Sequence, residues 1–321
     1  MIGRLKQENL EELTKANHYR GFRGALRLVR EKQFYRLWWL CKRKLRIMAE
    51  RKTASIFLPA SMRAPAGGKA GKSADINNEP TAPDYFSGER IAVYTVILGT
   101  YDLLREPKCC PDNCDFFLIS DGAEPPKDSV WKQMHLPPEV REQTRGMDAL
   151  RKNRFLKMRP DLLFSEYQYS VYLDGNMQMV TDPTEFVNRM PACGVSLFRH
   201  AFRDCVYEEA RAVLVRKKAA KDDVAKLVRF LKEEHMPAHY GLLECPVIVR
   251  RHHQPECLEI MEAWWELFGR FPYRDQLLLP YVLYQRGIRP EELAWLGNDV
   301  HMDPSFRRYQ HQNGEKQELD I

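Results

Sequence analysis

The stretch SVYLDGNMQMV (170–180) decides how the rest of the chain is interpreted. Its first four residues suit a buried strand, which runs directly into Asp174, Gly175 and Asn176 before the chain becomes apolar again. An isolated carboxylate at the end of a buried strand is costly to desolvate unless it is paired or binds a cation. The stretch therefore predicts a strand that ends at a polar site.

Apolar strands alternate with helical patterns on both sides of this stretch. We expect strands at 91–98, 115–120, 130–136, 170–174, 194–198 and 246–250, and helices at 145–158, 204–235, 255–268 and 275–286. This alternation predicts an α/β fold with a mostly parallel sheet that is covered on both faces. Ligands of such sheets bind beyond the carboxyl ends of the strands, where 99–102 and 174–176 stand.

The first quarter of the chain differs in composition from the rest. Residues 1–58 form a basic helical extension, 59–87 form a linker, and 88–321 form the main domain. The linker is rich in Pro, Gly, Ala and Ser, so it has little apolar surface to bury.

Positive charge is concentrated in the extension. Residues 20–52 contain twelve Lys and Arg against two Glu, a net +10, whereas the whole chain is +6 and the remainder is therefore −4. A nucleic-acid-binding domain is usually basic, so we do not expect a nucleic-acid partner. The same segment also has an apolar stripe on one helix face, formed by Phe34, Trp38, Cys41, Leu45 and Met48. Such a helix either lies on an anionic membrane surface or packs on the domain or on a second subunit.

The sequence also bears on location and cysteine chemistry. No window has 18 uninterrupted apolar residues, and the N-terminus lacks a secretory pattern. We therefore expect a cytoplasmic protein, or one held peripherally at the inner face of a membrane.

The eight cysteines are too sparse for a disulfide framework, and CCPDNC (109–114) lacks a second ligand pair for zinc.

The tripeptide at 174–176 has two interpretations. Asp174 and Asn176 offer oxygen ligands to Mg²⁺ or Mn²⁺, which would share the oxygens of a diphosphate. Gly175 would then allow a ligand or another backbone to approach closely. Alternatively, the tripeptide is a β-turn in which Gly175 and Asn176 supply unusual backbone angles.

Further polar groups follow other expected strands. His200, Arg203 and Glu208 lie where a strand opens a helix, and form either a site or an acidic helix start. Lys157 belongs to a basic helical group that either meets a diphosphate or is solvated. His301, in a late loop, either completes a metal site or is an ordinary loop histidine.

Two carboxylates are candidate bases. Asp275, between Arg274 and Gln276, is either a helix N-cap or a general base, and Glu244, just before a strand, is a similar candidate. The chain contains no P-loop, nucleophile elbow, HExxH motif or GxGxxG after the first strand.

Five blocks taken in order resemble a known family. They are IAVYTVILGTYD, RFLKMRPDLLFSEYQYSVYLDGN, RHAFRDCVYEEA, GLLECPVIVRRH and YRDQLLLPYVL. The chain resembles, over 90–290, the glycosyltransferase-like domain long catalogued as a domain of unknown function. That domain occurs in bacterial surface-polysaccharide gene clusters and in plant proteins linked to mucilage.

The resemblance implies a GT-A-type three-layer αβα fold. It also implies an enzyme that moves a sugar from a nucleoside-diphosphate sugar to a glycan or glycolipid acceptor in surface polysaccharide synthesis, with Mn²⁺ or Mg²⁺ on Asp174, Asn176 and His301. The third position of the metal motif is Asn176 where the broader pattern has Asp, and an amide is a weaker ligand than a carboxylate.

The resemblance also distributes roles along the chain. It implies that Asp275 is the acceptor base in preference to Glu244, with Arg274 and Gln276 beside it. The donor would contact Thr95, Gly99, Tyr101, Asp102, Lys157, Gly175, His200, Arg203 and Glu208. The rival hypotheses keep the fold but replace the transfer with nucleotide or glycan binding, or with metal-dependent hydrolysis.

Overall fold

The computed structural model describes residues 34–57, 62, 64–65, 88–99, 102–122, 124–188, 190–309 and 311. Its strands are β1 (Ile91–Ile97), β2 (Cys114–Ser120), β3 (Trp131–Gln133), β4 (Tyr169–Leu173), β5 (Met177–Met179), β6 (Val195–Arg199), β7 (Leu243–Arg251) and β8 (Phe306–Arg308). Its α-helices are α3 (Phe34–Phe57), α4 (Pro138–Gln143), α5 (Ala149–Met158), α6 (Thr184–Val187), α7 (Val206–Val215), α8 (Lys221–Glu233), α9 (Pro255–Arg270) and α10 (Leu279–Gln285). The 3₁₀ helices are η2 (Pro160–Leu162), η3 (Asp275–Leu277) and η4 (Pro290–Leu293).

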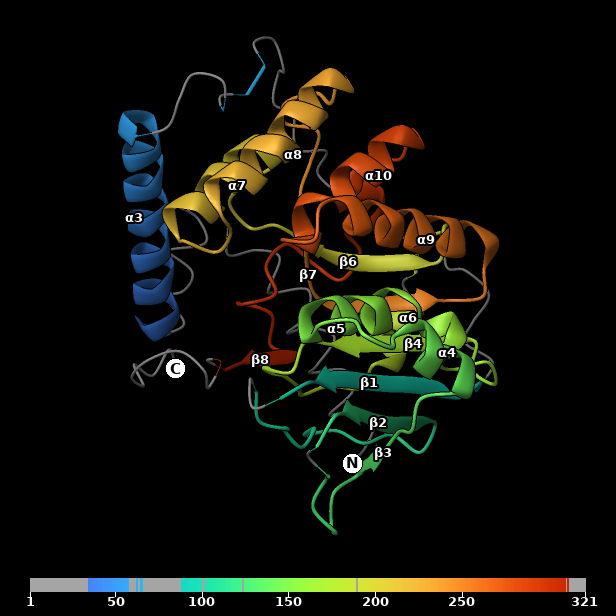
Figure 1. Ribbon diagram of the computed structural model, residues 1–321. Coiled ribbons are helices and arrows are strands. Elements are labelled where there is room, and N and C mark those ends of the chain that lie inside the picture. The colour runs from blue at the N-terminus through green and yellow to red at the C-terminus, as the bar shows by residue number, and fades with distance from the viewer. Residues whose placement is uncertain are drawn as a thin grey trace.

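A six-stranded sheet in the order β3-β2-β1-β4-β7-β6 forms the centre of the molecule (Figure 1). Strands β3, β2, β1 and β4 are mutually parallel, and β7 is antiparallel to both of its neighbours, β4 and β6. Within this sheet β7 therefore runs against the other five strands. The predicted α/β class with a mostly parallel sheet is confirmed.

Strand β1 is buried on both faces, and this explains its continuous apolar sequence. Ala92, Tyr94 and Val96 pack into a core shared with α5, α7, α8, α9 and α10. Ile91 and Val93 point to the opposite face, into a second core that α6, β5 and β8 help to close. The sheet is thus covered on both faces, by layers of unequal thickness.

The long helices expected from the sequence are divided in the structure. The stretch 204–235 forms α7 and α8, separated by a turn in which Lys217 has a φ of 52°. The stretch 275–286 forms η3 and then α10, because Pro280 lacks an N–H and fits the first turn of a helix but not its interior. The β5–β8 pair was not predicted, since each strand has only three residues.

Arg250 locks helix α5 to the sheet from inside the core. Its side chain is fully buried, and it donates to the Lys157 carbonyl at 2.6 Å and to the Tyr94 hydroxyl at 2.7 Å. These two bonds offset part of the cost of burying the guanidinium, whose Nε has no hydrogen-bond partner within the described chain. These bonds fix the last turn of α5, which carries Lys157, relative to strands β1 and β7.

Helix α3 packs beside α7, with its axis running past the end of the sheet (Figure 1). The side chains of Cys41, Leu45 and Met48 on its predicted apolar stripe are exposed; those of Phe34 and Trp38 lie outside the described part. The helix therefore packs on the domain through a different face from the predicted one. None of the described helices is long and apolar enough to cross a bilayer.

The buried imidazole of His252 predicts a pH dependence of stability. His252 is 1% exposed, its Nε2 lies 3.0 Å from the Phe164 carbonyl, and its Nδ1 has no hydrogen-bond partner within the described chain. Burial lowers the pKa of His252 from 6.5 to about 4. Between those two pH values the unfolded chain binds a proton that the folded chain does not, so stability falls as the pH falls.

We expect this residue to cost about 3 kcal/mol of unfolding free energy when the pH falls from 7 to 4. The measurement is urea denaturation across that range for the wild type and for His252→Gln, whose amide does not titrate. The variant should lose less stability on acidification, and the exposed control His135→Gln should behave like the wild type. Equal pH profiles for the wild type and His252→Gln would contradict the assignment.

Candidate active site

Polar side chains from four strands meet at one edge of the sheet. Asp102 follows β1, Asp174 follows β4, and His200 follows β6. Glu244 lies inside β7 and not before it as predicted, and the antiparallel direction of β7 brings its first residues to this same edge. Backbone hydrogen bonds join these segments to β7 and the residues just before it. The Asp174 N–H donates to the Pro246 carbonyl at 2.8 Å, and the His200 N–H donates to the Leu242 carbonyl at 2.9 Å.

Asp174 belongs to a buried ion network. The Lys157 ammonium lies 3.3 Å from Asp174 and 2.8 Å from Asp275, and the Tyr172 hydroxyl donates to Asp174 at 2.9 Å. Lys157 is 1% exposed, so its charge is used inside the protein. The expected role of Lys157 as a counter-charge for a diphosphate is therefore replaced by one within the fold.

Asp275, the residue expected to act as base, is enclosed. It is 4% exposed, and Arg154 lies 3.2 Å from the same carboxylate oxygen that Lys157 contacts. Burial by itself would raise the pKa of Asp275, but the charges of Arg154, Lys157 and Arg274 outweigh it and hold that pKa far below its ordinary value. Its neighbour Gln276 donates to the Leu243 carbonyl at 2.9 Å and so ties η3 to β7.

Gly175 is needed for a close approach between segments. A Cβ atom at this position would lie 2.8 Å from the Asp102 Oδ2 atom and 3.0 Å from the Ile97 Cγ1 atom. Its φ is not positive, and the turn is closed by the Met177 N–H, which donates to the Asp174 carbonyl at 2.8 Å. The tripeptide is thus a turn, and its glycine allows the segment after β1 to pass close by.

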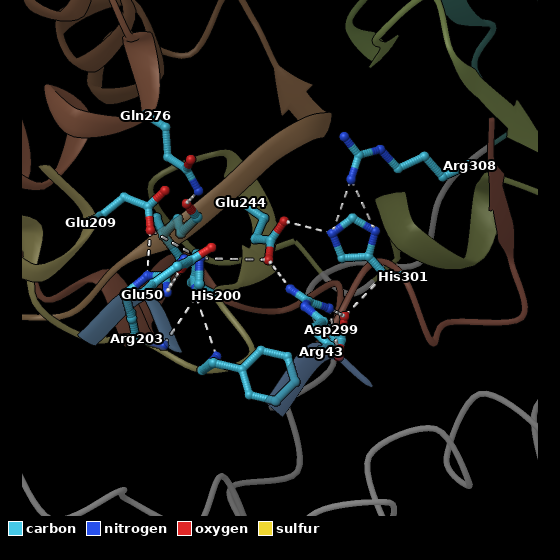
Figure 2. A network of polar contacts seen from close by, with 12 residues as sticks. Arg43, Glu50, His200, Arg203, Glu209, Glu244, Gln276, Asp299, His301 and Arg308 are labelled. Atoms are coloured by element: carbon cyan, nitrogen blue, oxygen red, sulfur yellow. Dashed lines mark hydrogen bonds and ion pairs between the residues drawn. The ribbon is translucent and has the colours of Figure 1, made fainter. Parts of the chain in front are cut away.

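Glu244 is the centre of a second polar cluster (Figure 2). One carboxylate oxygen lies 3.2 Å from Arg43 and 3.9 Å from the His200 ring, and the other lies 3.4 Å from the His301 ring. Burial would raise the pKa of Glu244, but His301, His200 and Arg43 hold it well below its ordinary value. The carboxylate is therefore ionised at neutral pH.

His301 lies between Glu244 and Arg308. The guanidinium of Arg308 is 3.4 Å from both ring nitrogens, and the His301 backbone N–H donates to Asp299 at 3.0 Å (Figure 2). Burial lowers the pKa of His301 below 6.5 despite the opposing effect of Glu244. Its imidazole is therefore neutral at pH 7, with a carboxylate at 3.4 Å to stabilise the protonated form.

The block after β6 forms a third cluster. Arg203 is ion-paired with Glu209, whose carboxylate is 3.6 Å from the His200 ring. His200 Nδ1 accepts from the Arg203 backbone N–H at 3.1 Å. Glu209, which is buried, carries these contacts, and the predicted Glu208, which is only half-buried, does not.

Helix α3 contributes two side chains that the sequence did not point to. Arg43 reaches Asp299 at 3.0 Å as well as Glu244, and its guanidinium lies 4.3 Å above the Phe202 ring. Glu50, 7% exposed, pairs with Arg216 at 2.7 Å and with Arg203 at 3.4 Å. The extension is therefore part of this edge of the domain.

The three expected metal ligands each have other polar partners in the structure. The Asn176 amide donates to the Tyr309 carbonyl at 2.8 Å and lies 3.4 Å from His311, whereas His301 lies with Glu244 and Arg308. No group of three or more His, Cys, Asp and Glu side chains within the described chain is arranged to hold a metal ion. The metal assignment to Asp174, Asn176 and His301 stays a prediction.

The expected donor-binding residues after β1 are divided. The Asp102 carboxylate accepts from the Nδ1–H of His311 at 2.7 Å, and the Gly99 N–H donates to Asp121 at 2.7 Å. Thr95 lies within β1, 3% exposed, and does not reach the edge. Tyr101 is outside the described residues. His311 was missed because it lies far along the chain with no motif around it.

Cations crowd the outer side of this edge. Desolvation lowers the pKa of Arg308, with further lowering by Arg43 and Arg274 against the pull of Glu244 and Asp174. Desolvation also lowers the pKa of Lys218 to about 8, together with the charges of Arg274, Arg308 and Arg216. Mutual repulsion of this kind is relieved when an anion binds among the cations.

Comparison with known proteins identifies relatives of one functional class. The family model TOD1/MUCI70, glycosyltransferase-like domain, matches residues 140–302, about half of the chain. The probable hexosyltransferase MUCI70 of Arabidopsis thaliana is 27% identical over 144 residues, which are 40% of this chain. The chain covers 24% of the length of that protein.

Solved structures overlap with this fold only in part. The bifunctional glycosyltransferase WbbM has a TM-score of 0.39 and 11% identity, with coverage of 66% of this chain and 39% of its own. The galactosyltransferase LgtC, in complex with donor and acceptor sugar analogs, has a TM-score of 0.39 and 8% identity, with coverage of 68% and 86%. Mouse xyloside xylosyltransferase 1 has a TM-score of 0.34 and 13% identity, with coverage of 64% and 83%.

The ion pairs of Glu50 predict how firmly α3 is held. We expect Glu50→Gln to weaken its attachment by about 1–3 kcal/mol, because the neutral amide leaves Arg216 and Arg203 less well compensated. Hydrogen exchange should then speed up in 41–53. The exposed control Glu266→Gln on α9 should leave exchange in 41–53 unchanged, and unchanged exchange in Glu50→Gln would show that these pairs do not hold the helix.

Proposed function

The chain belongs to the TOD1/MUCI70 family of glycosyltransferase-like domains, and we propose that it transfers a sugar from a nucleoside-diphosphate sugar to a glycan or glycolipid acceptor. The observation that carries the proposal is the pairing of Glu244 with His301 at 3.4 Å, beside crowded cations, at the carboxyl edge of the sheet. A base and a diphosphate site side by side are what sugar transfer requires.

The cations supply the donor half of the proposal. Departure of the nucleoside diphosphate develops negative charge, and preorganised positive groups that stabilise it usually make the largest contribution to catalysis. Desolvation lowers the pKa of Lys218 to about 8, and the positive charges of Arg274 and Arg308 act in the same direction. We assign the diphosphate to this cluster, with the nucleoside toward Gly99 and Asp102.

The Glu244–His301 pair supplies the acceptor half. A neutral imidazole held by a carboxylate accepts a proton well at neutral pH, since the carboxylate stabilises the imidazolium. Asp275 is less suited to this role than the pair, because two buried cations already occupy its carboxylate. Asp275 instead holds Lys157, and Lys157 holds Asp174.

The proposed transfer exchanges one bond at the anomeric carbon of the donor for another. The acceptor hydroxyl oxygen forms a bond to the anomeric carbon of the donor, and the bond from that carbon to the diphosphate breaks. The hydroxyl proton passes to His301, and the diphosphate leaves with the bonding electrons into the Arg274 and Arg308 cluster. The sugar passes through an oxocarbenium-like state, by analogy with glycoside cleavage. No step is assigned to a metal.

We predict that Glu244→Gln and His301→Asn each lower turnover by about 10²–10⁴, the range for loss of a general base. The measurement is a transfer assay with UDP- and GDP-sugars and a panel of saccharide acceptors. Both variants should keep the rise in Tm that UDP or GDP produces in the wild type, because both retain Arg274 and Arg308. The exposed control Glu234→Gln should be fully active.

The same panel separates the proposal from its rivals. Thermal shifts with UDP and GDP are measured with and without Mn²⁺, and again with saccharides alone. A response to saccharide without any response to nucleotide would contradict transfer and indicate a glycan-binding module. Wild-type turnover in both variants would show that Glu244 and His301 are not the base.

A further inference from the structure

Helix α3 presents two chemically different faces, one buried against the domain and one exposed. We propose that the outer face of α3 binds the surface of an anionic lipid bilayer, while its inner face stays attached to the active-site edge. The proposal goes beyond sugar transfer and does not depend on it, since vesicle binding is measured without any substrate.

The inner face is fixed by ion pairs. Arg43, Ile47 and Glu50 recur at spacings of four and three, so they lie on one side of the helix. Ile47 and Glu50 are each 7% exposed, and Arg43 pairs with Glu244 and Asp299. Within the described side chains, the attachment of α3 thus does not use Cys41, Leu45 or Met48 of the predicted stripe.

The outer face carries that stripe. Leu45 is 65% exposed and Met48 is 59% exposed, and Cys41 is exposed on the same side, four residues before Leu45. The exposed residues Lys42, Lys44, Arg46 and Lys52 flank these three. Glu50, the one acidic residue of 41–53, points inward to Arg216 and Arg203. The outer face is therefore apolar and positive.

An anionic bilayer fits this face better than a second copy of the chain. A helix that combines an apolar stripe with flanking Lys and Arg lies in the interface of a membrane, with the stripe inserted among the headgroups. Each basic residue near an anionic surface improves binding by about fivefold. A second copy would bring the same positive charges against each other, and residues 20–52 already carry a net +10.

A bilayer bound to α3 would also orient the active-site edge toward the membrane. In Figure 1, α3 lies beyond the ends toward which β1 and β4 point, which is the edge that carries Asp174 and Glu244. A bilayer against the outer face of α3 would therefore lie on the active-site side of the molecule. Such an orientation suits a lipid-linked acceptor.

The test is sedimentation of the full chain with vesicles of phosphatidylcholine, with and without phosphatidylglycerol. We expect binding to the vesicles that contain phosphatidylglycerol, and a loss of more than tenfold in Leu45→Glu/Met48→Glu. Leu150→Glu, which changes a 42% exposed leucine of α5, is the matched control and should bind like the wild type. Because Leu45 and Met48 are exposed, the double variant should unfold at the wild-type Tm.

Three results would overturn the proposal. The first is no binding to anionic vesicles, and the second is binding that the double variant does not weaken. The third is a wild-type dimer that the double variant converts to a monomer, measured by light scattering, since the face would then join two copies. Loss of vesicle binding with the UDP or GDP thermal shift intact would leave the proposed sugar transfer unaffected.

Discussion

The buried ammonium of Lys157 ties together three separate parts of the chain at the edge of the sheet. It carries a charge from α5 to Asp174 at the end of β4 and to Asp275 in η3. Removing one partner of such a buried network leaves an uncompensated charge, which is far more costly than the network is favourable. The positions of the turn at 174–176 and of η3 are therefore coupled, and Arg250 fixes the same turn of α5 through the Lys157 carbonyl.

The charges of this edge are arranged in two layers. In the inner layer Lys157 and Arg154 pair with Asp174 and Asp275, and in the proposed function these groups support the site. In the outer layer Glu244 and His301 form a pair that can exchange a proton, next to arginines that suit a diphosphate. Helix α3 joins the outer layer through Arg43, which links the N-terminal extension to the proposed chemistry.

Sequence patterns predicted the strands well, because β1, β4 and β7 are buried runs whose apolar residues leave little choice. They also predicted that Asp174 and His200 follow strands. They did not predict that Glu244 joins the same edge, which depends on the antiparallel direction of β7. They did not predict pairings such as Arg43 with Glu244, which are 201 residues apart and depend on the fold. For the same reason the roles expected for Asp275 and Lys157 differ from those in the structure. The sequence shows that both side chains are ionisable, but not that they form an ion pair with each other.

Helix α3 also shows what the sequence pattern could and could not predict. Its periodicity correctly indicated an apolar stripe, but the ion pairs of Arg43 and Glu50 decided which face meets the domain.

We propose that a diphosphate binds among the outer cations, and a crystal structure with UDP or GDP tests this binding site directly. The account predicts phosphate oxygens within hydrogen-bond distance of Arg274 and Arg308, beside the Glu244–His301 pair. A diphosphate bound away from this edge of the sheet would contradict it.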